Sequence, residues 1–524
     1  MPSPGSRPRP RPWAAGLPLP LLLLAGLGAL LPALPAGAAR LPAPARPERP
    51  ERLRLGGMPP AGRWGGVGAE AAGPEVEVDA AAAAAATTVW GGEPVLAGLL
   101  GVREPGSGYQ RWRTPDHAGW FQWYYFWLHD AVRGMNWALT VAAVYCDGVT
   151  EGACPNAGAY VGFVAIDQGV SPTSQAAYAS HQRVDKYPLA WLKASTTTQD
   201  LSIVDPETLL PLVKVQASDN GEEVHVAAVS GAKESKPLLG AGEFRWNVKL
   251  LREFGWFGQS QLEWGARVVG VLQWSTYMHR AKVAGQVKAS LDDKGSWVPI
   301  ISDLSPAIAR GYGDSNWGHA MLRPPPGDHD YENYEWGWFV AGGTLDSGEE
   351  LSVAAGVGRS YMPIMGVLQA KFCDFRIGDR VKLEIVHVVN EDLFDVAVGL
   401  SNHGLVSRYH VTRGGWREAP EALGGGRIPM EQNVTIAGAF GEVSLNFQAP
   451  EGCYTRLPFW SPDGSTFGDF ECLGALAQVS LRAKRGSELH GLLGGQDFHF
   501  SSRAAGLEFG FRDGDGLAEG LVAS

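Results

Sequence analysis

The chain lacks the short motifs that mark several large enzyme classes. It has no phosphate-binding GxxxxGK[ST] loop, no HExxH pair, no CxxC pair and no GxSxG turn between a strand and a helix. The 12 histidines are scattered, and His279, His319 and His329 near the centre do not have the spacing of metal ligands. These absences argue against P-loop, zinc-protease, dithiol and α/β-hydrolase chemistry. We expect no metal and no cofactor.

Positive charge is also scarce. The 44 Lys and Arg residues are outnumbered by 55 Asp and Glu residues, which gives a net charge of −11 at pH 7 and a pI near 5.6. Proteins that bind nucleic acids usually carry a basic surface, so we expect no nucleic-acid partner. Beyond the N-terminal segment, no run of residues is long and apolar enough to span a bilayer.

The N-terminus has the pattern of a secretory signal. Arginines within the first 11 residues precede an apolar run at 17–34, and small residues suited to cleavage follow it. We expect a cleaved signal peptide over residues 1–39, with a signal anchor as the alternative. Residues 40–102 are low in complexity, which predicts a linker. The expected destination is a plastid reached through the secretory pathway, or else the secretory lumen or the cell exterior.

Cysteine is rare, with five residues in the chain. Cys146 and Cys154 close one short polar loop, and Cys453 and Cys472 flank another loop that contains turn residues. Both pairs are candidate disulfides in an oxidising compartment, against the alternative of incidental thiols. Cys373 lies in an apolar setting and is expected to stay free.

Glycine and tryptophan, by contrast, are abundant, with 69 Gly and 19 Trp. Long amphipathic helical patterns are scarce, whereas short runs rich in β-branched and aromatic residues recur from about residue 103. In the run 243–251, apolar and polar residues alternate as in a strand with one buried face. The other expected strands are 120–128, 136–145, 159–166, 224–229, 284–290, a run from 336, 351–357, 380–388, 393–400, 433–436, 443–447, 476–481 and 507–511.

This strand pattern restarts after Gly343 and so divides the ordered chain into two sets. Many short antiparallel strands in succession are typical of barrels and sandwiches. We therefore predict an all-β fold of two consecutive antiparallel β-barrels or sandwiches, at 103–345 and 346–524. A barrel of about eight strands has an interior able to hold one small apolar ligand.

The stretch Gly311-Tyr-Gly-Asp-Ser-Asn-Trp-Gly318 combines glycines, aromatic rings and one acid. An acid in such a setting is either a satisfied structural carboxylate or a proton donor with a raised pKa. An apolar pocket walled by aromatic rings suits carbocation chemistry, because ring faces stabilise positive charge and exclusion of water prevents quenching. The plain alternative is a packed barrel interior. The candidate lining residues are Trp123, Tyr124, Tyr125, Trp274, Tyr277, Trp317, Trp336 and Trp338.

Several motifs resemble those of one family. Phe121-Gln-Trp-Tyr-Tyr-Phe126 resembles the early aromatic strand of tocopherol cyclases and their lipocalin-like relatives, the carotenoid 1,2-hydratases and fungal lipocalin-type Diels–Alderases. Residues 312–318 are similar to the shared Y-x-[ED]-x-N-W-G motif, and 336–339 to the aromatic strand after it. The stretches 472–476 and 501–510 are similar to the closing segment of tocopherol cyclases. The resemblance covers about residues 105–512 and implies two lipocalin-like, calycin-type barrels.

Some positions depart from the family pattern. Gln122 stands where the family usually has Glu, so a proton donor is missing there. Gly313 and Ser315 stand where the hydratase and Diels–Alderase branches carry His. Asp314, however, stands where tocopherol cyclases place an acid.

The resemblance implies a tocopherol-cyclase-like isomerase, an intramolecular lyase that acts on a prenylated hydroquinone. Protonation of a double bond in the prenyl tail leaves a tertiary cation, which the ring hydroxyl attacks to close a chromanol ring. Asp314 is expected to be the general acid, with its pKa raised by burial. Asn316 and Tyr312 are expected to orient it. No redox cofactor or metal is implied.

Two other functions stay open. A relative acting on another isoprenoid or polyene, by hydration or pericyclic closure, needs a shaped pocket more than an acid. A non-enzymatic carrier of a hydrophobic ligand needs only the barrel. In each case the partner is a small hydrophobic molecule, and contact with a membrane or lipid-droplet surface is left open.

Overall fold

The computed structural model describes residues 112, 120–145, 156–168, 179–230, 237–240, 242–253, 273–293, 296–318, 335–362, 366–390, 396–420, 427–460 and 466–512. The chain separates into the units 1–76 and 77–524, and every described residue belongs to the second unit. The predicted signal peptide, the predicted linker and the predicted pair of Cys146 and Cys154 lie outside the described residues.

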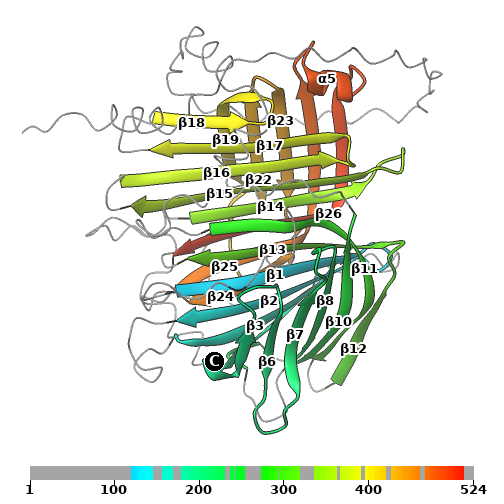
Figure 1. The fold of residues 1–524 in the computed structure, drawn as a ribbon, viewed down its shortest axis with the longest axis vertical. Coiled ribbons are helices and arrows are strands. Elements are labelled where there is room, and N and C mark those ends of the chain that lie inside the picture. The colour runs from blue at the N-terminus through cyan, green and yellow to red at the C-terminus, as the bar shows by residue number, and fades with distance from the viewer. Residues whose placement is uncertain are drawn as a thin grey trace, which may run out of the picture. The chain divides into compact units, whose positions relative to one another are not determined.

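The first part of the described chain forms one antiparallel sheet (Figure 1). Its thirteen described strands follow the order β5-β6-β7-β8-β10-β11-β13-β1-β2-β3-β4-β9, with β12 paired to β11. The short 3-10 helix η2 (Leu189–Trp191) precedes β5. In chain order the strands are β1 (Trp120–Asp130), β2 (Met135–Tyr145), β3 (Gly158–Asp167), β4 (Ala179–Tyr187), β5 (Leu192–Ala194), β6 (Leu201–Val204), β7 (Pro211–Ala217), β8 (Glu223–Val229), β9 (Leu239–Gly240), β10 (Glu243–Arg252), β11 (Gln273–Asp293), β12 (Ser296–Leu304) and β13 (Ala309–Gly318).

The later part forms a second antiparallel sheet with eleven described strands. Ten of them close into a barrel, because β23 pairs with β22 on one side and with β25 on the other. A separate two-stranded sheet joins β20 (Arg417–Glu418) to β21 (Arg427–Ile428), and the helix α5 (Glu488–Leu492) precedes β26. The strands of the second sheet are β14 (Glu335–Thr344), β15 (Glu350–Met362), β16 (Gly366–Ile377), β17 (Val381–Asn390), β18 (Val396–Ser401), β19 (Gly404–Gly414), β22 (Glu431–Gly438), β23 (Gly441–Gln448), β24 (Tyr454–Trp460), β25 (Thr466–Ala483) and β26 (Phe498–Arg512).

The prediction of an all-β fold built from two consecutive antiparallel sheets is confirmed. The second sheet closes into a barrel, whereas the first is an open half-barrel. Strand β14 belongs to the second sheet, so the change of sheet falls between Gly318 and Glu335, while the domain boundary between residues 345 and 346 stays a prediction. None of the helices in the described residues has the length and apolarity needed to cross a membrane.

Alternation along the strands divides the apolar side chains among three clusters. In β10, Phe244 and Trp246 are buried while Arg245 and Asn247 are exposed, as the sequence predicts. One cluster lies on the inner face of the first sheet and another inside the closed barrel. A third cluster draws residues from both sheets, and we call it the middle layer. Its members are Phe121, Tyr125, Trp127, Ala138, Ala142, Val144, Tyr160, Val164, Ile166, Val184, Tyr312, Trp336, Trp338, Val340, Ala354, Val367, Leu457 and Leu473.

The predicted disulfide between Cys453 and Cys472 is present, and Cys373 is free and buried. The two cysteines of this disulfide are 19 residues apart in the sequence, so the bond restricts the conformations that the unfolded chain can adopt. We expect the double substitution Cys453→Ser and Cys472→Ser to lower the free energy of unfolding by about 3 kcal/mol, as measured by denaturant titration. The wild-type chain in a reducing agent should then unfold at the same denaturant concentration as the double variant. Equal stability of the variant and the oxidised wild type would contradict this.

Candidate functional site

Strand β13 carries three polar groups of the central motif on one face. Tyr312, Asp314 and Asn316 are two residues apart, so their side chains point to the same side. The Tyr312 hydroxyl donates a hydrogen bond to Asp314 Oδ2 at 2.8 Å, and Asn316 Nδ2 donates to Asp314 Oδ1 at 3.3 Å. The Asp314 side chain is therefore held from both oxygens, although it is only 3% exposed.

A second pair of hydrogen bonds fixes the direction of the Tyr312 hydroxyl. Trp338 Nε1 donates to its oxygen at 3.0 Å, and the Thr276 hydroxyl lies 3.1 Å away. An indole N–H can only donate, and a tyrosine has one hydroxyl proton to give. Because that proton goes to Asp314, Thr276 acts as the second donor to Tyr312. The hydrogen bonds from Trp338 to Tyr312 and from Tyr312 to Asp314 thus link the second sheet to the acid of the first.

Glycines on the opposite face explain how this polar sequence forms a strand. A Cβ atom at Gly311 would meet side-chain atoms of Val283 at 2.9 Å and Leu250 at 3.1 Å. A Cβ atom at Gly313 would meet the ring of Tyr277 at 3.0 Å. These contacts are tighter than packed side chains normally tolerate. The glycines therefore make room for the core of the first sheet, and do not serve ligand approach.

The neighbouring strand β11 is irregular opposite this motif. Thr276 pairs with Asp314, Met278 with Gly313 and Ala281 with Gly311, so β11 contains two bulges within six residues. A bulge places an extra residue in one strand and redirects side chains. Here it allows the adjacent residues His279 and Arg280 to line the same crevice.

Trp338 is the centre of an aromatic group in the middle layer. The rings of Tyr312, Tyr125 and Trp127 approach it edge-on, at centroid distances of 5.2, 5.7 and 6.5 Å. Edge-to-face contacts of this kind are favourable beyond the area that they bury. Trp336, on the same face of β14, lies over Gly510, where a Cβ atom would collide with the indole.

The structure divides the predicted lining residues between two faces of the first sheet. Tyr125, Trp336 and Trp338 lie in the middle layer, and Trp123 packs against it. Tyr124 and Tyr277 lie in the inner core of the first sheet, and alternation places Trp317 on that side as well. Trp274 pairs through its backbone with Asn316, while its side chain is outside the described residues. The rings that share a face with Asp314 are therefore those of the middle layer.

Three further acids meet Tyr125 in the same region, and the sequence analysis missed them. Asp469 and Glu471 lie on β25 and Glu508 on β26, and their carboxylate oxygens are within 4.8 Å of one another. We call them the acid triad. Acids at alternate positions of the apolar run Asp469-Phe-Glu-Cys-Leu473 were the signal that could have revealed them. Register explains the contact, since Glu471 pairs with Glu508 directly and Glu508 pairs with Trp338.

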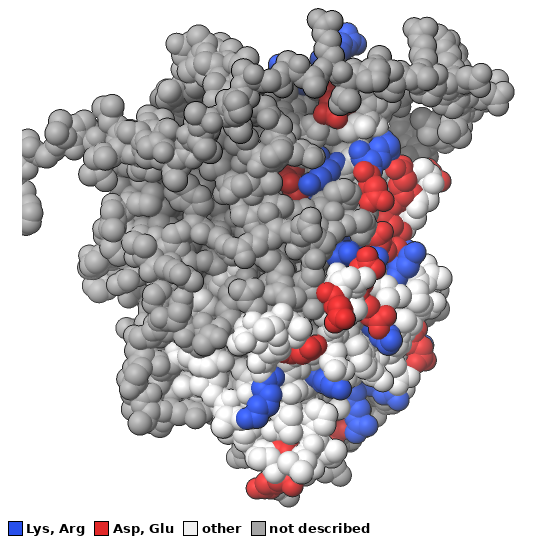
Figure 2. All heavy atoms as spheres, viewed as in Figure 1, with Lys and Arg blue, Asp and Glu red and all other residues white. Residues whose placement is uncertain are grey.

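Burial of the acid triad favours its protonated form. Burial, followed by the charges of Glu508 and Glu471, raises the pKa of Asp469 well above its usual range. Burial, followed by the charges of Glu508 and Asp314, likewise raises the pKa of Glu471 well above its usual range. Burial raises the pKa of Glu508 to about 7, although hydrogen bonds with Trp336 and Asp469 act to lower it. Asp469 and Glu471 are buried and Glu508 is half-buried, whereas the charged side chains drawn in Figure 2 are of both signs and interspersed.

The acid triad should make stability depend on pH. Glu508 has a pKa of about 7 in the folded chain and about 4.5 when unfolded, so the folded state binds more protons between these values. Its contribution is complete below the unfolded pKa and is lost as the pH rises through 7, a change of about 3 kcal/mol. We expect Glu508→Gln to flatten the fall in unfolding free energy between pH 5 and about 8, while the exposed Glu431→Gln leaves it unchanged. An unaltered slope in Glu508→Gln would contradict this.

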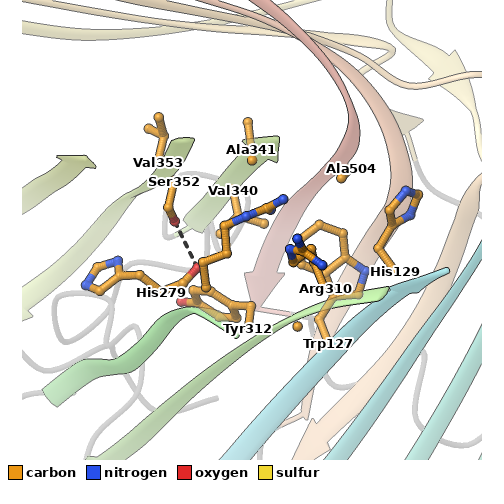
Figure 3. A pocket seen from close by; sticks show the side chains of 13 residues that line it. Trp127, His129, His279, Arg310, Tyr312, Val340, Ala341, Ser352, Val353 and Ala504 are labelled. Carbon is orange, nitrogen blue, oxygen red and sulfur yellow. Dashed lines mark hydrogen bonds between the residues drawn. The ribbon is translucent and has the colours of Figure 1, made fainter. Parts of the chain in front are cut away.

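A small crevice lined by both polar and apolar residues touches Tyr312 (Figure 3). It has room for about one water molecule. Figure 3 shows Trp127, His129 and Arg310 on one side of it and His279 on the other, with Tyr312 between them. The lining residues are Trp127, His129, His279, Arg280, Arg310, Gly311, Tyr312, Val340, Ala341, Gly342, Ser352, Val353 and Ala504.

Buried ion pairs connect the two sheets beside this crevice. His279 Nε2 lies 3.0 Å from Asp374 Oδ2 on β16, and the same oxygen lies 2.7 Å from Arg376. Arg376 also contacts Glu384 at 3.2 Å. Burial lowers the pKa of His279, although Asp374 acts in the opposite direction. The pair His279–Asp374 therefore joins β11 to the closed barrel.

Comparison with solved structures finds remote likenesses. Kievitone hydratase from Nectria haematococca aligns with 79% of this chain and 96% of its own, at 10% identity and a TM-score of 0.39. CghA, solved with Sch210972, aligns over 79% of this chain and 95% of its own, at 10% identity and a TM-score of 0.39. An AttH-like protein from Nitrosomonas europaea aligns with 77% of this chain and 94% of its own, at 13% identity and a TM-score of 0.36. No protein-family model and no curated protein matches the sequence. Likenesses this remote carry no argument about reaction or substrate.

Proposed function

We propose that the chain is an enzyme that adds a proton to a carbon–carbon double bond of an apolar isoprenoid or polyene. The observation that carries this proposal is the position of Asp314, a buried acid that two donors orient on the face of an aromatic layer. Protonation of an alkene needs an acid held beside an apolar substrate, and the resulting cation needs aromatic faces and little water. Asp314 is the catalytic carboxyl group, and Tyr312 and Asn316 position it.

The cation is then captured by an oxygen nucleophile. The crevice beside Tyr312 favours water, because it has room for about one water molecule, has His279 and Arg310 in its lining and touches the residue that orients Asp314. The product of that route is a tertiary alcohol, and the enzyme is a hydratase. The second route is capture by a hydroxyl group of the substrate itself, which closes a chromanol ring on a prenylated hydroquinone. The resemblance of the central motif to tocopherol cyclases favours this second route.

The first test is incubation of the purified full-length chain with two substrates, a prenylated benzoquinol and an acyclic polyene, under anaerobic conditions. Mass-resolved chromatography separates the outcomes. A product with the mass of the substrate indicates ring closure, and a product heavier by one water indicates hydration. Either product must disappear with Asp314→Asn. Unchanged substrate that co-elutes with the protein would replace the proposal by a carrier function, and product formation that ignores Asp314→Asn would indicate pericyclic closure by the pocket alone.

A further inference from the structure

We propose that the acid triad, together with Tyr125, is a second catalytic site that faces Asp314 and supplies the proton for the alkene. This inference rests on the proposed function and assigns separate roles to the carboxyl groups of the two sheets. Glu471 is the proton donor, Asp314 is the proton acceptor, and the Tyr125 hydroxyl returns the proton between them. Neither the central motif nor any sequence motif assigns a role to the acid triad.

The strand register brings the two sites together. Tyr125 and Asp314 are direct partners on neighbouring antiparallel strands, so their side chains share a face. In the second sheet, Glu471 and Glu508 are direct partners in the same way. All four carboxyl groups act electrostatically on the Tyr125 hydroxyl, with the largest effect from Glu471. Tyr125 is therefore within electrostatic reach of the acid of the first sheet and of those of the second.

The acid triad needs protons because no cation in the described part of the chain acts strongly on it. Among the described residues, the groups that act most strongly on its members are other acids, Tyr125 and Trp336, and none of these groups is a lysine or an arginine. Both oxygens of Asp469 and one of Glu471 accept no hydrogen bond from an N–H or hydroxyl donor in the described chain. Carboxylates this close cannot all be charged in a buried site, so neighbouring acids share protons.

Tyr125 provides an independent sign that the site acts on something. Its side chain is only 5% exposed, and its hydroxyl lies beside Glu471 without completing a hydrogen bond of normal geometry in the described residues. Buried hydroxyl groups normally have a partner. A hydroxyl left in this state within electrostatic reach of Glu471 and Asp314 is placed to receive a proton from one and to give a proton to the other.

Asp314 differs from the acid triad in its surroundings. It accepts a hydrogen bond at each carboxylate oxygen, from Tyr312 and from Asn316. Glu471 has no comparable pair of donors. We therefore assign the acceptor role to the carboxyl group that donors hold at both oxygens, and the donor role to the one that lacks such a pair.

The proposed steps balance in protons and electrons. The O–H bond of Glu471 breaks as a C–H bond forms with the electron pair of the alkene, which leaves a tertiary cation. The oxygen nucleophile forms a C–O bond to the cation, and its own O–H bond breaks as the proton passes to Asp314. Tyr125 then gives its proton to Glu471 and takes one from Asp314, which restores the starting state. No oxidant or reductant takes part.

The test uses the full-length chain in D2O, where donor and acceptor variants should behave differently. With Asp314→Asn the donor is intact, so the alkene is protonated and deprotonated again, and deuterium appears in the recovered substrate without product. With Glu471→Gln, both product and substrate deuteration should fall by at least about 100-fold. The matched control is Glu384→Gln, another buried glutamate of the second sheet outside the middle layer, which should keep product formation.

Tyr125→Phe tests the return of the proton. The first turnover should keep its wild-type rate, while steady-state turnover slows, and a merely structural role would not separate the two. The inference is overturned if Glu471→Gln turns over like the wild type while Asp314→Asn forms no product and exchanges no deuterium into the substrate. That result would leave the proposed function intact. Full activity in both variants would overturn the proposed function as well.

Discussion

Asp314→Asn should fold like the wild-type chain and lose product formation by about 100-fold to 10,000-fold. The substitution keeps the shape of the side chain and its ability to accept a hydrogen bond from Tyr312. It removes the negative charge of Asp314 and its capacity to exchange a proton, and it replaces one of the two acceptor oxygens by an NH2 group that can only donate. Because Asp314 is 3% exposed and oriented at both oxygens, no solvent acid can take its place without rearrangement.

The measurement is product formation per mole of folded protein, with folding checked by circular dichroism and thermal unfolding. Asp303→Asn is the matched control, since Asp303 lies on the neighbouring β12, is exposed and contacts Gln286. It should leave turnover unchanged. Full activity of Asp314→Asn in a well-folded chain would remove Asp314 from the mechanism.

Arg376→Met should produce the largest loss of stability, about 3–5 kcal/mol. Arg376 is 1% exposed and lies between Asp374 at 2.7 Å and Glu384 at 3.2 Å. Its guanidinium group, with His279, outweighs burial and lowers the pKa of Asp374. Removal of the cation leaves two buried carboxyl groups facing each other, and both lose the partner that offsets their desolvation.

Denaturant unfolding at pH 7 measures this loss. Arg380→Met is the control, because Arg380 pairs with Glu349 on the surface and is 41% exposed there. Exposed ion pairs contribute about 0–1 kcal/mol, so the control should lose little. A similar small loss for both variants would show that Arg376 does not stabilise the two buried carboxyl groups beside it in the closed barrel.

Local pattern in the sequence was enough for most of the described strands. Runs such as 243–251 combine strand-forming residues with strict alternation, and the structure places their apolar side chains inside. The Gly311–Gly318 stretch was different, because its glycines and polar residues have low strand propensity. It becomes β13 because β1 and β11 pair with it on both sides and because its glycines leave room for Leu250, Val283 and Tyr277.

The sequence could place only part of the candidate site. Once β1 and β11 hold this stretch as a strand, alternation puts Tyr312, Asp314 and Asn316 on one face, so only their spacing follows from the chain itself. The aromatic side chains of Tyr124 and Tyr125 are neighbours in the sequence, yet they face different cores. Sequence distance could not reveal this, since the face that each ring occupies depends on which side of the sheet is covered.

By itself, then, the sequence determined the all-β class and the restart of the strand pattern, and it marked Cys453 and Cys472 as candidate disulfide partners. These depend on period-two alternation and on residues close along the chain. Tertiary structure alone decided that Asp314 would meet Tyr125, Trp338 and the acid triad. Those groups come from β1, β14, β25 and β26. Only the packing of one sheet on the other brings them together, and the same packing removes the water that would keep their carboxyl groups charged.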